Sequence, residues 1–126
     1  MTKTTTTTNT KHERVESFSV DHKGMLVRAV TPRRGQPYQH RCRLASLEAV
    51  AHRFDEFGEG DTVEIIAGAI DQPVTQVATA LAFLLERGIV ERIGKLTYPA
   101  SIDVHLDAMT EYHALRDKGP EQVDPA

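Results

Sequence analysis

The side chains best suited to chemistry in this sequence are a histidine and the only cysteine, which stand two positions apart in the run YQHRC. On a β-strand, His40 and Cys42 would share one face, so they could begin a metal site or act as base and nucleophile. A metal would need further donors from His52, His105 or His113, and a nucleophile would need an orienting acid that the run lacks. We therefore expect a structural pair, and we predict no enzyme activity, no metal site and no cofactor.

Charge divides the chain into two parts. Residues 1–43 carry nine Lys and Arg against three Asp and Glu, a net charge of +6, whereas residues 44–126 carry six against fifteen, a net charge of −9. A basic segment suits the phosphates of a nucleic acid. It also suits the acidic remainder of the same chain, and the sequence leaves both interpretations open.

Length and composition set the class of protein. A chain of 126 residues with 40% hydrophobic content suits one domain with a single core. One cysteine excludes an internal disulfide, and it excludes zinc sites with four cysteines or with two cysteines and two histidines. No apolar run is long enough to span a bilayer, and residues 1–11 lack the apolar centre of a secretory signal. We therefore expect a cytoplasmic protein that does not enter the membrane.

The elements that must position the functional residues are clearest within residues 61–99. Asp61, Thr62 and Glu64 form a helix-start signal. The apolar residues that follow recur at helical spacing, namely Val63, Ile66, Ala67 and Ile70. The sequence therefore predicts a short helix here.

A second helix and a hairpin follow. Pro73 can open the helix because the first helical position needs no amide donor, and Gly88 can stop it in a left-handed conformation. The buried stripe of this helix consists of Val77, Leu81, Leu84 and Leu85. Beyond Gly88 the helical period is lost, and β-rich residues on both sides of Gly94 indicate a short hairpin.

These segments resemble the winged helix-turn-helix family, and the resemblance lies in TVEIIAGAID, QPVTQVATALAFLLERGIVERIG and KLTYP. It implies a winged helix-turn-helix core, and the patterns on both sides of it add an N-terminal β-hairpin extension and an extra C-terminal helix, so we expect an α+β fold. It also implies that the second helix and the wing form the functional surface. The family includes DNA-binding regulators and protein-interaction modules. We expect a DNA-binding transcriptional regulator, because the helix-turn-helix pattern is intact and a basic segment is present, and the protein-interaction module is the alternative.

For the DNA-binding regulator, the second helix would offer polar side chains to base edges in the major groove. The positions that we expect to be exposed and to read bases are Gln72, Thr75, Gln76 and Thr79. This helix has no lysine or arginine before Arg87, so phosphate contacts must come from elsewhere. The candidates are Arg92 and Lys95 at the wing and Arg33, Arg34, Arg41 and Arg43 in the basic segment.

Segments on both sides complete the expected domain, residues 13–117. Alternating apolar residues predict a hairpin near residues 17–30, and a third strand is expected at 38–43 after a loop with two prolines and a glycine. Residues 13–43 are an addition to the winged-helix pattern. Residues 1–12 are expected to be a disordered threonine-rich tail, and residues 118–126 a loose tail.

Two further helices are expected. Ser46 can cap the first, which carries apolar residues at helical spacing and should end at Gly58 or Gly60. Ser101 can cap the second, over about residues 102–116. The apolar stripe of this last helix is wider than a small three-helix core can cover. It must therefore pack on the N-terminal strands or on a second subunit, and we favour a homodimer in which Met109, Tyr112 and Leu115 help to form the interface.

Overall fold

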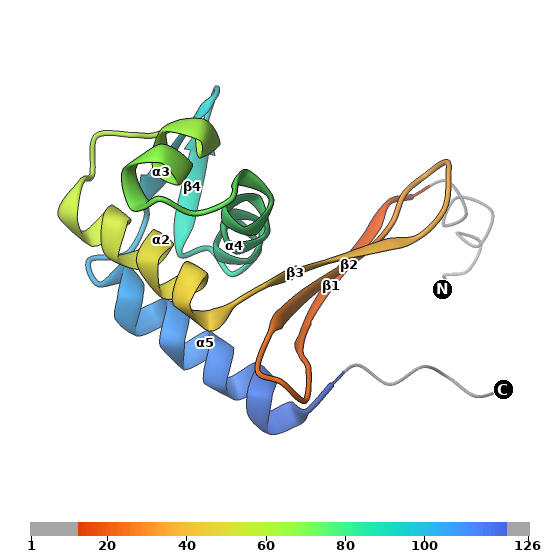
Figure 1. Cartoon of the computed structure of the whole chain (residues 1–126). Coiled ribbons are helices and arrows are strands. Elements are labelled where there is room, and N and C mark those ends of the chain that lie inside the picture. The colour runs from red at the N-terminus through yellow and green to blue at the C-terminus, as the bar shows by residue number, and fades with distance from the viewer. Residues whose placement is uncertain (1–12, 121–126) are drawn as a thin grey trace, which may run out of the picture.

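A computed structural model describes residues 13–120 as a mixed α+β fold with two antiparallel sheets and four helices (Figure 1). The first sheet contains β1 (Val15–Val20), β2 (Leu26–Thr31) and β3 (Tyr38–Cys42). The helices of the central part are α2 (Leu44–Glu56), α3 (Val63–Ile70) and α4 (Val74–Glu86). The second sheet is the hairpin of β4 (Val90–Ile93) and β5 (Leu96–Pro99), and α5 (Val104–Lys118) follows it. The predicted order of helices and strands is thus confirmed, whereas the tail expected at residues 1–12 lies outside the described residues.

The three-stranded sheet has its middle strand in β2, and its register decides which side chains face the helices. Phe18 pairs with Arg28, and Arg28 pairs with His40, so these three side chains share the face that meets α4. The turn between β1 and β2 is closed by Asp21, whose Oδ1 accepts hydrogen bonds from the amides of Lys23 and Met25. The hairpin that was predicted from the apolar alternation is therefore confirmed.

The α2, α3 and α4 helices enclose a core to which the first sheet also contributes. The phenyl rings of Phe18 and Phe83 meet edge to face with centroids 5.5 Å apart. Asp61 joins the helices to the second sheet, because it pairs with Thr97 through both backbone hydrogen bonds. Its carboxylate, which is almost fully buried, accepts a hydrogen bond from Arg53 Nε at 2.9 Å.

The start of α2 differs from the prediction. This helix begins at Leu44 after Arg43, so Ser46 is an internal residue and not the cap. Ser46 is fully buried, and its hydroxyl lies within hydrogen-bond distance of the side-chain carbonyls of Gln72 and Gln76. Ser46 therefore connects α2 to Gln72 and Gln76 at the start of α4, and a helix-cap signal cannot reveal such a contact because it uses only residues close in the sequence. The helix also ends at Glu56, before the expected glycines.

The starts of the other three helices differ in how far they follow the sequence signals. In α4, Pro73 is the residue before the helix and not its first position. Thr62 caps α3 and accepts a hydrogen bond from the amide of Ile65, so the predicted helix start is confirmed. In α5 the cap is Asp103 rather than Ser101, and Asp103 accepts from the amide of Leu106. Ile102 precedes this helix and is fully exposed, at 105% of its reference area.

The last helix packs on α2 and β1 of its own chain (Figure 1). Tyr112 and Leu115 are buried, at 1% and 7% exposure, and Met109 packs partly buried against the core. Of the two partners expected for this stripe, the one within the chain is therefore observed, and the stripe is not the exposed surface on which the predicted dimer interface depended. Lys118 is the last residue of α5 and not part of a tail.

No helix within residues 13–120 combines the length and the apolar character that crossing a membrane requires.

Candidate binding site on helix α4

Two glutamines expected to read bases are used within the chain. The backbone amide of Arg43 donates to Gln76 Oε1 at 2.9 Å, and the Ser46 hydroxyl lies 3.0 Å from the same oxygen. Gln72 Oε1 also lies within hydrogen-bond distance of Ser46. Bidentate recognition of adenine uses both the oxygen and the nitrogen of a glutamine amide. While these bonds hold, the carbonyl oxygen of Gln76 is already occupied.

The two threonines of the same set differ in exposure. The expectation that Thr79 is exposed is wrong, because its side chain is fully buried and its hydroxyl donates to the carbonyl of Thr75 at 2.9 Å. The first sheet covers this side of α4, where Phe83 lies one turn further along and meets Phe18. Thr75 is exposed. It is therefore the member of the set that faces solvent freely.

The outward face of α4 is mainly apolar. One side of this helix carries small or aliphatic residues that are exposed or half-buried, namely Val74, Ala78, Ala82 and Leu85. Thr75 and Glu86 border it. The helix lies between the β4–β5 hairpin and the three-stranded sheet (Figure 1). Ala78, Ala82 and Leu85 of this face line a depression whose walls include Arg28 of β2 and Arg92 of β4.

A pocket of about 520 Å³ occupies this depression. Its floor is apolar and its rim is charged. The apolar lining comes from Val63, Ala78, Leu81, Ala82 and Leu85, and the ionisable lining comes from Arg14, Glu16, Arg28, Glu86 and Arg92. The pocket therefore joins the first sheet, α3, α4 and the β4–β5 hairpin in one site.

Two arginines in this pocket contact the same carboxylate. Arg28 donates its Nε hydrogen to Glu16 Oε2, and an Arg14 terminal nitrogen lies 3.7 Å from that oxygen. Only 16% of the Arg28 side chain is exposed, compared with 45% for Arg14. Arg92 completes the basic rim from β4 and is exposed. Three positive charges and two negative charges thus line the pocket.

Sequence reasoning missed Arg14, Glu16 and Arg28 as site residues. The available signal was an arginine in the middle of the apolar strand LVRAV, on the same strand face as the buried Val30. A charged residue on a core-facing position requires a partner or a cavity. The strand register was needed to identify Glu16 as that partner.

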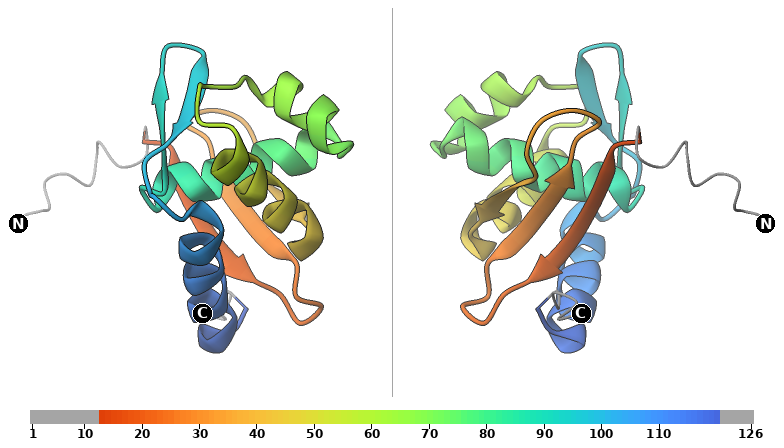
Figure 2. Two further views of the ribbon diagram at one scale, coloured as in Figure 1. Left: turned by 90° about the vertical axis from the view of Figure 1, so that its left-hand side faces the viewer. Right: turned by 90° about the vertical axis from the view of Figure 1, so that its right-hand side faces the viewer.

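The remaining basic candidates occupy different places. Arg33 and Arg34 are exposed in the loop between β2 and β3, and Lys95 is exposed at the turn between β4 and β5. Figure 1 and Figure 2 show that this loop and this turn both stand on the side of the molecule away from the end of α5, and Figure 1 shows them well apart, with α4 between them. Arg41 lies on the opposite face of the first sheet from Arg28, with its Nε 3.4 Å from Asp21 Oδ2.

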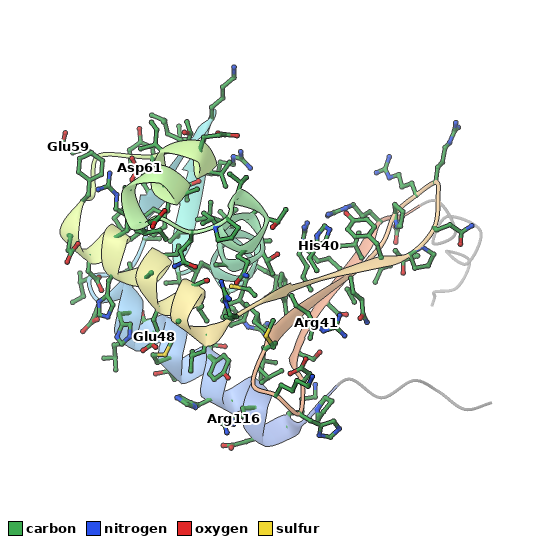
Figure 3. The ribbon with its side chains drawn as sticks, viewed as in Figure 1. His40, Arg41, Glu48, Glu59, Asp61 and Arg116 are labelled. Atoms are coloured by element: carbon green, nitrogen blue, oxygen red, sulfur yellow. The ribbon has the colours of Figure 1, made fainter. Side chains whose placement is uncertain are left out.

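These placements bear on the question of whether the basic segment neutralises the acidic part of its own chain. The ion pairs of Arg14, Arg28 and Arg41 are made with Glu16 and Asp21, which belong to the basic segment itself. Four exposed cations form no ion pair with any residue between 13 and 120. They lie on two ribbon tips, Arg33 and Arg34 in the loop between β2 and β3 and Arg92 and Lys95 on the β4–β5 hairpin. In Figure 3 Glu59 and Asp61 lie at the far side of the helices from the first sheet.

Cys42 and His40 do not form a reactive pair. Burial raises the pKa of the Cys42 thiol to about 12, and its Sγ lies 3.3 Å from the carbonyl oxygen of Arg43, a hydrogen-bond acceptor. His40 is exposed and its ring lies against Tyr38, with centroids 5.0 Å apart. Within residues 13–120, no three His, Cys, Asp or Glu side chains gather in an arrangement that would hold a metal ion.

A pair of stacked histidines between α2 and α5 was not predicted from the sequence. His52 of α2 and His105 of α5 stack with ring centroids 4.0 Å apart, and His105 Nε2 lies 3.2 Å from Glu48 Oε2. Asp55 accepts hydrogen bonds from the amides of Val104 and His105. These contacts hold the start of α5 against α2, which is a structural role.

The comparisons with known proteins give no match for this chain among protein-family models, curated proteins or solved structures.

Proposed function

We propose that residues 44–99 form a winged helix-turn-helix unit, with α3 and α4 as the helix pair and the β4–β5 hairpin as the wing. The order of elements supports this assignment, because a helix, a one-residue β-bridge at Asp61, two helices and a hairpin follow one another. The left-handed backbone at Asp71 (φ 56°) gives the sharp turn between α3 and α4. The three-stranded sheet is then an addition that packs beside α4.

The function that this arrangement supports best is binding of double-stranded DNA through phosphate contacts, with little base preference. One observation carries it, namely that exposed, unpaired cations stand on two β-ribbon tips, one on each side of α4 and both on the side of the molecule away from the end of α5. Phosphate contacts supply most of the affinity of such proteins and do not depend on sequence. The two tips are formed by Arg33 and Arg34 on one ribbon and by Arg92 and Lys95 on the other.

Base reading by α4 receives less support than phosphate binding. The major groove is about 12 Å wide and admits one helix with its side chains, whereas α4 lies between a sheet and a hairpin. Gln72 and Gln76 are bonded within the chain, and Thr79 is buried. We therefore expect a weak preference between sequences, contributed by Thr75.

Fluorescence anisotropy with random-sequence duplexes at low and at physiological salt tests this function. The double variant Arg33→Ala/Arg34→Ala should weaken binding to every duplex and flatten the plot of log affinity against log salt by about 0.9 per lost contact. The matched control is Arg116→Ala/Lys118→Ala, which removes the same charge from the exposed end of α5. Equal losses in the two variants would attribute binding to net charge alone.

A second candidate function is a protein-interaction module, and the apolar outward face of α4 favours it. Val74 is 47% exposed on α4 and Ile93 is 62% exposed on the hairpin. Exposed aliphatic residues on two elements that contact each other, here α4 and β4, are typical of interaction surfaces. The absence of duplex binding even at low salt would support this candidate over the first.

A further inference from the structure

We propose that the α4 pocket binds a small organic carboxylate with an apolar body, and that Arg28 anchors the carboxylate. The proposal does not depend on DNA binding, because its anchor, Arg28, is not one of the cations at the ribbon tips, and only Arg92 belongs to both sites. A volume of about 520 Å³ falls within the usual range for small-molecule sites.

The anchor is supported by the geometry of Arg28. Its Nε hydrogen is donated to Glu16, whereas its terminal nitrogens form no hydrogen bond with any residue of the described part of the chain. The Arg28 side chain projects from β2 and only 16% of it is exposed, so the surrounding residues and the bond to Glu16 hold it in place. A guanidinium held at its Nε side presents its remaining hydrogens as a fork, which matches the two oxygens of a carboxylate.

The balance of charge favours a ligand with one negative charge. Arg14, Arg28 and Arg92 carry three positive charges in the pocket lining, and Glu16 and Glu86 carry two negative ones. A monocarboxylate neutralises the remaining charge. A phosphate monoester would bring close to two negative charges beside two glutamates, which disfavours it.

The apolar residues that line the pocket indicate that the rest of the ligand is a hydrocarbon group. Ala78 and Ala82 leave space above α4, and Leu81, Leu85 and Val63 surround that space with aliphatic carbon. An inorganic anion would leave this surface in contact with water. A ligand with a hydrocarbon body removes it from water, so affinity should rise by up to about fourfold for each added methylene group.

The test uses the full chain, amide NMR titrations and straight-chain fatty acids from hexanoate to decanoate as probes. We expect saturable shifts at the residues that line the pocket, with tighter binding as the chain lengthens. The neutral amide decanamide should bind at least about tenfold more weakly than decanoate, because it lacks the charge-assisted pair with Arg28. Acetate and inorganic phosphate should not saturate in the same concentration range.

Two variants probe the two halves of the site. Arg28→Lys keeps the charge and the ion pair with Glu16 but lacks the fork, and it should weaken decanoate binding about tenfold or more. Ala82→Phe fills the space above α4 from a half-buried position without changing charge, and it should abolish binding. Arg116→Gln on α5 is the control and should bind as the wild type does.

Several results would overturn the proposal. These are equal affinity for decanamide and decanoate, shifts that map outside the pocket, or saturable binding of phosphate alone. Unchanged binding in a folded Ala82→Phe variant would also overturn it, and this variant remains informative if Arg28→Lys does not fold.

Discussion

Tyr112 is the residue that most directly tests how α5 joins the rest of the chain. Its ring is buried, and its hydroxyl donates to the carbonyl of Gly24 at 2.6 Å, in the turn between β1 and β2. Tyr112→Phe keeps the ring and removes this hydrogen bond, which should lower the free energy of unfolding by about 1 kcal/mol. Tyr112→Ala also leaves a cavity and should cost about 3 to 5 kcal/mol.

The pKa of Tyr112 leads us to expect that the stability of the fold depends on pH. Burial raises the pKa of the Tyr112 phenol, so the folded state favours the neutral form. Its contribution to stability is therefore complete below the ordinary tyrosine pKa of about 10 and declines as the pH rises through the folded-state pKa. Tyr112→Phe should remove this part of the decline in alkaline solution.

Urea unfolding followed by circular dichroism measures both effects, with Ile102→Ala as the control. Ile102 is fully exposed, so its replacement should change stability by less than about 0.5 kcal/mol. A loss below about 1 kcal/mol for Tyr112→Ala would refute the packing of α5 on its own hairpin. A midpoint that rises with protein concentration would show that a second copy contributes to stability.

Three further predictions concern the interior. Gln76→Ala should lower the free energy of unfolding by about 1 to 3 kcal/mol, measured in urea, because the Arg43 amide and the Ser46 hydroxyl lose their acceptor. Gly60→Ala should reduce the thermal midpoint more than Gly35→Ala does, because both glycines have positive φ but only the Cβ at position 60 meets a ring, at 2.7 Å from Tyr98. Cys42 should react with iodoacetamide at pH 8 only as fast as the protein opens, since its pKa is about 12, and rapid alkylation of the folded chain would contradict its burial.

The order of helices and strands could be predicted from the sequence because each element carries a local pattern. The apolar spacing of α4 and the glycine after it are sufficient to define that helix, and Gly88 does adopt a positive φ of 72°. The β1–β2 hairpin follows from alternation and from Asp21 in the turn. These signals involve residues close together in the sequence.

Of the charged residues that line the α4 pocket, only Arg92 was predicted as a site residue, because the pocket depends on contacts between distant segments. Ser46 has the local features of a helix cap, but its partners are Gln72 and Gln76 on the next helix pair. Thr79 lies at a position of α4 that would be exposed to solvent in a unit of three helices alone. In this chain the three-stranded sheet covers it. The choice between the N-terminal strands and a second subunit as the partner of the α5 stripe also required the structure, in which Tyr112 contacts the turn of the N-terminal hairpin.

The central claim, that two basic ribbon tips bind the duplex, is tested most directly by amide NMR with the full chain and a short random-sequence DNA duplex at low salt. The account predicts shifts in residues 32–37 and 92–96 that disappear as salt is raised, with no shifts along α5. Shifts centred on α5, or an unchanged spectrum with duplex in excess, would contradict it.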